Sequence, residues 1–266
     1  APPDDLSLLG EEAQHVYAFL KSEGAVFPAE LRAGTGLAEA ARRMRERGLD
    51  ERAVAVFADY YHQLESGAQG TIPEDTIVPL VDLPRLEGVE ASDAERAEAL
   101  RQVVVIKLNG GLGTSMGLAG AKSALSVRDG LTFLDVIARQ VLALRAQYAA
   151  PLPLLFMNSF RTAQETEAIL AAYPDLPVRG LPLGFLQSAE PKLRADDLRP
   201  VDWPANPELE WCPPGHGDVY LSLARTGLLD LLRGMGIRYA FLSNADNLGA
   251  TCDPDIAAWL LREQVP

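Results

Sequence analysis

The chain has 266 residues, 48% of them hydrophobic, so it can bury a substantial core and is not composed like a disordered protein. Its 24 Lys and Arg residues against 37 Asp and Glu give a net charge of −13, which argues against binding to nucleic acid or to an anionic membrane. Two cysteines and three histidines argue against a disulfide scaffold and against a multi-histidine metal site. We expect a cytoplasmic globular protein.

The first third of the chain has helical periodicity. Apolar residues recur at helical spacing in residues 11–22, 36–47 and 49–64, and charged residues fill the opposite faces. Gly48 separates the second and third of these stretches, as a glycine at the end of a helix does. The pattern predicts an N-terminal helical segment over residues 1–66.

Residues 67–101 change character. Pro73, Pro79 and Pro84 interrupt any helix there, with short apolar runs between them. Ser92 followed by Glu95 then has the spacing of a capping box, which predicts the start of a short helix. We interpret residues 67–101 as an extended connector and a short helix.

From residue 102 onward, strand and helix patterns alternate. Short apolar runs predict strands at residues 103–108, 153–160, 181–186 and 238–244. Amphipathic stretches predict helices at residues 132–148, 162–173, 219–232 and 254–263, with an irregular stretch at 191–217. This alternation is typical of an α/β fold with a mainly parallel, doubly wound sheet.

A glycine-rich loop, LNGGLGTSMG at residues 108–117, directly follows the first predicted strand. Glycines allow backbone N–H groups to approach phosphate oxygens, so the loop favours phosphate binding. It is not a mononucleotide P-loop, because Lys122 follows Ala121 and not a glycine. It is not the dinucleotide motif GxGxxG either, because Met116 stands at the third glycine position.

Lys122 lies eleven residues beyond Gly111 and is one of only four lysines, against twenty arginines. A lysine at the far end of such a loop can fold back onto the charge that the backbone amides stabilise. The alternative is a plain glycine turn with a surface lysine.

Two further residues have positions that suit a site. Asp246 follows a predicted strand, and ligands bind at the carboxyl ends of parallel strands. His216 lies in the sequence PPGHGD, where prolines and glycines would hold one side chain at a fixed place. Taken alone, Asp246 fits a turn equally well, since Asn247 and Gly249 follow it, and a lone histidine is more often structural.

These residues belong to a set of motifs that resembles one known family. KLNGGLGTSMG at residues 107–117 resembles the signature of the UTP–glucose-1-phosphate uridylyltransferases, the UDP-glucose pyrophosphorylases. TFLD (132–135), LFMNSF (155–160), WCPPGHGDVY (211–220) and LSNADNLGAT (242–251) are similar to further motifs of that family, in the same order. The resemblance runs from about Ile72 to the end of the chain. It implies a Rossmann-like nucleotidyltransferase fold, with residues 102–266 as the nucleotide-binding half of the catalytic domain.

The resemblance also implies a reaction. An oxygen of glucose 1-phosphate attacks the α-phosphorus of UTP, which gives UDP-glucose and pyrophosphate without a protein nucleophile. Lys122 would be catalytic, stabilising charge on the α-phosphate, and Asp246 would hold Mg²⁺ beside the phosphates. The family usually has proline where this chain has Ala121, which would loosen the backbone before the lysine.

The same comparison of motifs implies the remaining contacts. Met157 and Gln187 would read the uracil, whose edge offers hydrogen-bond groups that a glutamine amide can match. Asp218 is expected to cap the helix that follows it. The implied nucleotide-binding residues are Leu108, Asn109, Gly110, Gly111, Gly113, Thr114, Met157, Gln187, Pro214 and Gly215. The implied sugar-phosphate-binding residues are His216, Asn244, Ala245 and Asp246, of which Asp246 is also the metal ligand.

Three alternatives stay open from the sequence. A nicotinamide-dependent oxidoreductase would use Asp129 or Asp135 as the ribose-binding acid. A pyrophosphorylase for UDP-galactose or UDP-N-acetylhexosamine is a nearer alternative, although hexosamine-type loops usually carry arginine where this chain has Ser115. The third is a truncated nucleotide-binding module without turnover.

The motifs end one predicted helix beyond Asp246, whereas the family continues with a longer second half. We therefore expect these residues to be the N-terminal portion of a pyrophosphorylase, with an incomplete catalytic domain. Alone, such a portion would bind UTP weakly and form little sugar nucleotide. A sheet cut at this point would expose apolar surface and strand edges, which favours self-association into a homo-oligomer.

Overall fold

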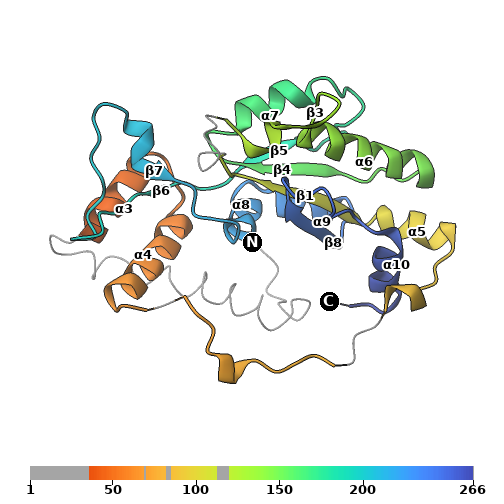
Figure 1. The fold of residues 1–266 in the computed structure, drawn as a ribbon, viewed down its shortest axis with the longest axis horizontal. Coiled ribbons are helices and arrows are strands. Elements are labelled where there is room, and N and C mark those ends of the chain that lie inside the picture. Colours follow the sequence, from red (N-terminus) through yellow and green to blue (C-terminus); the bar gives the residue numbers. More distant parts are fainter. Residues whose placement is uncertain (1–35, 69, 82–84, 113–119, 266) are drawn as a thin grey trace. The chain divides into compact units, whose positions relative to one another are not determined.

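A computed structural model describes residues 36–68, 70–81, 85–112 and 120–265 (Figure 1). The chain divides into two compact units. The first contains the described residues up to Val81 together with residues 189–212, and the second contains residues 85–188 and 213–265. Residues 189–212, which the sequence placed in the nucleotide-binding half, thus group with the N-terminal helices. Within these ranges, no helix combines the length and the apolar character that a membrane span requires.

The first unit consists of two helices and a small antiparallel pair of strands. Its elements are α3 (Gly36–Glu46), α4 (Glu51–Glu65), the 3₁₀ turns η2 (Glu74–Thr76) and η6 (Pro207–Glu210), and the strands β6 (Glu190–Pro191) and β7 (Trp211–Cys212). Gly48 ends α3 with φ +79°, as predicted, and the Asp50 side chain accepts a hydrogen bond from Arg52 N at the start of α4. The predicted helix at residues 11–22 lies outside the described residues.

The second unit contains a four-stranded sheet in the order β5-β4-β1-β8, and each of its strand pairs is parallel. The strands are β1 (Val103–Asn109), β4 (Leu154–Asn158), β5 (Gly184–Leu186) and β8 (Tyr239–Asn244). The order confirms the predicted parallel α/β sheet. It places the end of β1, where the glycine loop begins, between the ends of β4 and β8.

Helices cover both faces of this sheet (Figure 1). One face packs against α5 (Asp93–Leu100), α6 (Phe133–Tyr148), α7 (Ala163–Leu170) and α10 (Pro254–Arg262). The other packs against α8 (Asp218–Arg225) and α9 (Leu228–Gly234). The short elements η3 (Leu86–Gly88), η5 (Lys122–Ala124), β2 (Ser126–Arg128) and β3 (Leu131–Thr132) complete the unit.

The alternation of side chains along the buried strands explains the two cores. Val103 and Val105 of β1 pack on the face that holds α6, whereas Val104 and Ile106 pack on the face that holds α8 and α9. Both faces of β1 are covered, which is why the sequence of this strand is a continuous apolar run and not an alternating one.

Side-chain caps that the sequence indicates set several helix starts. Ser92 and Glu95 form the predicted capping box of α5, and Thr132 and Asp135 form a second one at α6. The predicted helix at 219–232 is wrong as a single helix, because Gly227 adopts φ +73° and divides it into α8 and α9. The predicted strand at 181–186 is shorter, since only residues 184–186 pair with β4.

Candidate functional site

The candidate site lies at the carboxyl ends of β1, β4 and β8. Leu108 is in register with Asn244, and Ala245 N donates a hydrogen bond to Leu108 O at 3.0 Å. The first residue beyond β8 is therefore tied to the strand that begins the glycine loop. Ala245 is buried in the apolar core, so Asp246 is the first residue after this strand whose side chain reaches solvent.

Lys122 and Asp246 meet at this edge. Lys122 Nζ donates to Asp246 Oδ2 at 3.0 Å, and the side chains are 39% and 35% exposed. The two residues are 124 positions apart in the chain, and sequence reasoning had given them separate roles at the phosphates. The structure brings the predicted catalytic lysine and the predicted metal ligand into direct contact.

A buried network of side chains fixes the backbone next to Lys122. Asn109 Nδ2 donates to Asn158 Oδ1 and to Thr166 Oγ1, both at 2.8 Å. Ser123, the residue after Lys122, donates its hydroxyl to Asn109 Oδ1. These four side chains are at most 3% exposed. Because the Asn109 amide is fully used inside the protein, only the backbone of this residue remains for a ligand, which is the contact that the resemblance implies.

The far end of the glycine loop is closed by backbone contacts. Lys122 N donates to Gly111 O at 3.3 Å, and residues 112 and 121 form an antiparallel bridge. Ala121 N donates to Glu165 Oε2 at 2.7 Å. A Cβ at Gly120 would lie 2.5 Å from the same carboxylate oxygen, so glycine allows this approach. Gly113 and Thr114 lie outside the described residues.

The two predicted base-reading residues lie in different surroundings. Gln187 is 6% exposed and its amide lies against Gly110, since a Cβ at Gly110 would lie 2.5 Å from Gln187 Nε2. Gln187 is thus placed beside the first residues of the glycine loop. The Met157 side chain is fully buried in the apolar core on the α8 and α9 face, so only its backbone could contact a base.

The PPGHGD stretch lies directly before α8. Gly215 adopts φ +111° and His216 is exposed. Asp218 was predicted to cap this helix, and that prediction is wrong. Asp218 is the first residue of α8 and follows the N-cap Gly217. Its carboxylate accepts from Ser188 N at 2.6 Å and from the Ser222 hydroxyl at 2.7 Å. Because Ser188 follows Gln187, this contact brings the start of α8 to the end of β5.

The donor set fits Mg²⁺ held mainly by substrate. In the described part of the chain, no three His, Cys, Asp or Glu side chains are close enough together to hold a metal ion. Mg²⁺ is usually bound by one or two carboxylates together with phosphate oxygens and waters. The single carboxylate of Asp246 at the strand end suits that arrangement once the Lys122 ammonium group, which now occupies Oδ2, turns away from it.

The structure argues against the oxidoreductase alternative, because both aspartates proposed to bind a ribose have structural roles. Asp129 lies with Gly130 in the tight turn between β2 and β3, both at positive φ. Asp135 accepts hydrogen bonds from Thr132 and from the Tyr173 hydroxyl, so its carboxylate is part of the α6 capping box.

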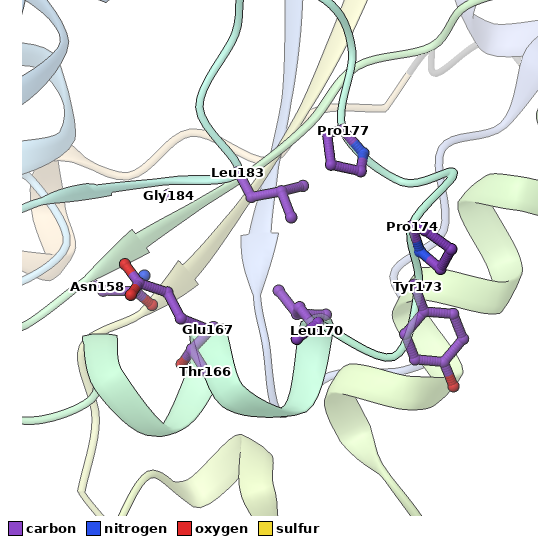
Figure 2. A pocket seen from close by; sticks show the side chains of 10 residues that line it. Asn158, Thr166, Glu167, Leu170, Tyr173, Pro174, Pro177, Leu183 and Gly184 are labelled. Carbon is purple, nitrogen blue, oxygen red and sulfur yellow. The ribbon is translucent and has the colours of Figure 1, made fainter.

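A pocket of about 170 Å³ lies next to the site, between α7, the end of β4 and the start of β5 (Figure 2). Asn158 and Thr166 form one end of it, and mostly apolar side chains such as Leu170 and Leu183 form the rest. It includes neither Lys122 nor Asp246. Its volume is below the range of pockets that enclose drug-sized ligands.

Sequence reasoning missed the residues that hold the site together. Asn158, Thr166 and Glu165 had no assigned role, although Asn158 ends a strand within a recognised motif. A polar residue at the end of a buried strand is the signal that could have identified it, because it needs a hydrogen-bond partner.

The fold and the site together define a Rossmann-like α/β domain with a lysine–aspartate pair at the carboxyl edge of its sheet. The family described as UTP–glucose-1-phosphate uridylyltransferase matches residues 54–266. This chain belongs to that family.

Individual relatives agree with this assignment. The chain is 42% identical over 191 residues to a UTP–glucose-1-phosphate uridylyltransferase of Solanum tuberosum, covering 71% of this chain and 38% of that protein. One from Saccharomyces cerevisiae is 38% identical over 246 residues, covering 89% and 48%. The chain thus spans less than half the length of these curated relatives.

Solved structures agree as well. A UDP-glucose phosphorylase from Trypanosoma brucei superposes with a TM-score of 0.79 at 43% identity, covering 87% of this chain and 49% of that one. A UDP-glucose pyrophosphorylase variant from Leishmania major in complex with UDP-glucose gives 0.76 at 38% identity, covering 87% and 48%.

Proposed function

We propose that the full-length protein makes UDP-glucose and pyrophosphate from UTP and glucose 1-phosphate, in the cytoplasm. The observation that carries this proposal is the Lys122–Asp246 pair at the joined ends of β1 and β8 in a chain of this family. Lys122 would offer a positive charge to the α-phosphate, and Asp246 would offer a carboxylate ligand to a cation. For the location, only two cysteines among 266 residues is a composition usual in a reducing compartment.

The reaction requires that two anionic substrates approach each other. A phosphate oxygen of glucose 1-phosphate attacks the α-phosphorus of UTP, and the bond from that phosphorus to the bridging oxygen of pyrophosphate breaks. Positioning and charge stabilisation account for most catalysis in such displacements. Bound Mg²⁺, held by Asp246 and phosphate oxygens, would neutralise negative charge on the phosphates.

Side chains and backbone amides of this chain would supply the remaining contacts to the substrates. Lys122 would turn from Asp246 toward the α-phosphate, where it stabilises the charge that builds up during attack. The amides of Gly110 and Gly111 would hold the nucleotide, and Gln187 beside them would read the uracil. His216, exposed ahead of α8, would contact the sugar phosphate. The hydrogen bond from the Ser123 hydroxyl to Asn109 Oδ1 supports this arrangement, because it keeps the backbone next to Lys122 fixed while the Lys122 side chain turns.

The test of this proposal is pyrophosphate release by the full-length protein with UTP and a panel of sugar 1-phosphates, with and without Mg²⁺. We expect Lys122→Ala to lower turnover by at least about a hundredfold, as removal of one preorganised donor to a developing charge does. Lys192→Ala is the matched control, since Lys192 belongs to the other unit. Near-normal turnover of Lys122→Ala would remove this lysine from the mechanism.

Base selectivity is a second test, independent of turnover. Calorimetry with the full-length protein should show UTP binding well above CTP and ATP, because Gln187 lies beside the nucleotide loop. Equal affinities for the three nucleotides would show that the base is not read and would contradict the role of Gln187.

A further inference from the structure

Lys107 is a buried cation in the middle of the sheet. It lies in the central strand β1, in register with Phe156 of β4 and Ser243 of β8, and it is only 2% exposed. Strand alternation places its side chain on the same face as Val105, within the core that α6 and α10 cover. Lysine is rarely buried unless its ammonium group has partners, so the contacts of this residue need an explanation.

The ammonium group has polar partners but no carboxylate in ion-pair contact among the described residues. Lys107 Nζ donates to Ser243 Oγ at 2.7 Å and to Ala250 O at 2.8 Å, and it lies 5.5 Å from the centre of the Phe241 ring. Cys252 is close by, but burial raises the pKa of its thiol to about 11, so it is neutral at physiological pH. Burial also lowers the pKa of Lys107, to about 8.

The two hydrogen-bond partners lie on either side of Asp246. Ser243 is three residues before it in β8, and Ala250 is four residues after it in the loop that follows. Between them the loop folds back through the bonds Asn247 N to Asn244 O and Ala250 N to Asn247 O. A single ammonium group therefore joins the two ends of the short loop that carries Asp246.

We propose that Lys107 is a positioning residue that holds the Asp246 loop from inside the sheet, so that the carboxylate stays where Lys122 and a phosphate-bound cation meet it. The proposal rests on the function proposed above for Asp246. An apolar residue of the same length would fill the same space, but it would leave Ala250 O without its donor and remove the direct bridge between Ser243 and Ala250, so only the backbone bonds within the loop would remain. Side chains that orient a metal ligand in this way typically change metal affinity or activity by 10- to 100-fold.

Lys107→Met in the full-length protein tests this role, with Val105→Ala as the matched control. Both substitutions alter the same face of β1, and both should lower the melting temperature, but only the Lys107 side chain donates hydrogen bonds to Ser243 Oγ and Ala250 O. We expect Lys107→Met to raise the Mg²⁺ concentration for half-maximal activity about tenfold, and Val105→Ala to leave it unchanged. Ser243→Ala, which keeps the ammonium group and its bond to Ala250 O, should give a smaller increase.

Amide hydrogen exchange gives a readout that does not depend on activity. Lys107→Met should speed exchange in residues 245–252 by about tenfold relative to Val105→Ala, while the rest of the sheet exchanges alike in the two variants. Equal exchange in that loop would overturn the positioning role whether or not the protein makes UDP-glucose. An unsubstituted protein that makes no UDP-glucose, with the loop still loosened in Lys107→Met, would refute the proposed function and leave the structural role of Lys107 standing.

Discussion

The buried amide of Asn109 offers a direct test of how the site is held. Its side chain links three elements: the end of β4 through Asn158, the start of α7 through Thr166, and the η5 turn through Ser123. All three contacts are inaccessible to solvent, so water cannot replace them when the amide is removed. We therefore expect Asn109→Ala to destabilise the sheet unit more than an ordinary surface substitution.

The size of the effect follows from the partners that lose their bonds. Asn158 Oδ1 loses its donor and the Ser123 hydroxyl loses its acceptor, while Thr166 keeps the bond that it donates to Thr162 O. A buried polar group without a partner costs about 1–3 kcal/mol. Two such groups predict a loss of about 2–6 kcal/mol in the free energy of unfolding, a large share of the stability of a typical domain.

The assay is urea unfolding of the full-length protein, followed by far-UV circular dichroism. Gln102→Ala is the matched control, because its amide, just before the other end of β1, bonds only to Glu98 in an exposed contact. That control should lose less than about 0.5 kcal/mol. If Asn109→Ala loses less than about 1 kcal/mol, the neighbours re-pair without it, and the argument that this network fixes the site is wrong.

Two further predictions concern the loop and the pH dependence of stability. Gly110→Ala should weaken UTP binding roughly tenfold, about 1.4 kcal/mol, because the new Cβ would lie 2.5 Å from Gln187 Nε2; unchanged affinity in calorimetry would show that Gln187 moves without cost. The pKa of Lys107 falls from 10.5 to about 8 on folding, so between those pH values the unfolded chain binds more protons. Stability from this residue should therefore rise with pH across that window by up to about 3 kcal/mol. The pKa of Cys252 rises from 9.0 to about 11, which acts in the opposite direction at higher pH, so the measurement is the difference between wild type and Lys107→Met. A difference that stays flat from pH 8 to 10.5 would contradict the lowered pKa of Lys107.

The order of strands and helices could be predicted because the signals are local. The apolar run of β1, the capping boxes at Ser92 and Thr132, and Gly48 after α3 each act within a few residues of the chain. The prediction of a single helix at 219–232 was wrong because a local signal in it was not used. The predicted helix ran through Gly227 without a break, whereas the positive φ of this glycine ends one helix and begins another.

The site could be predicted only in part, because its contacts join distant residues. The motifs named Lys122, Asp246 and Asn109 separately, but no spacing in the sequence indicates that Lys122 meets Asp246. Asp218 shows the same limit: its position suited a helix cap, yet its carboxylate binds Ser188 N from the end of β5. A polar residue has many possible partners, and the fold selects among them.

The site is therefore held by two kinds of support with different consequences. Asn109 and its neutral partners hold the backbone beside Lys122, and Lys107 holds the loop that carries Asp246 from the adjacent strand. Lys107 and Asn109 lie two positions apart in β1. Both supports therefore depend on the register of β1 between β4 and β8. A shift of that register would separate Lys122 from Asp246 even if every side chain were kept. The strand that lies between the two cores thereby also sets the distance between the two charged groups of the site.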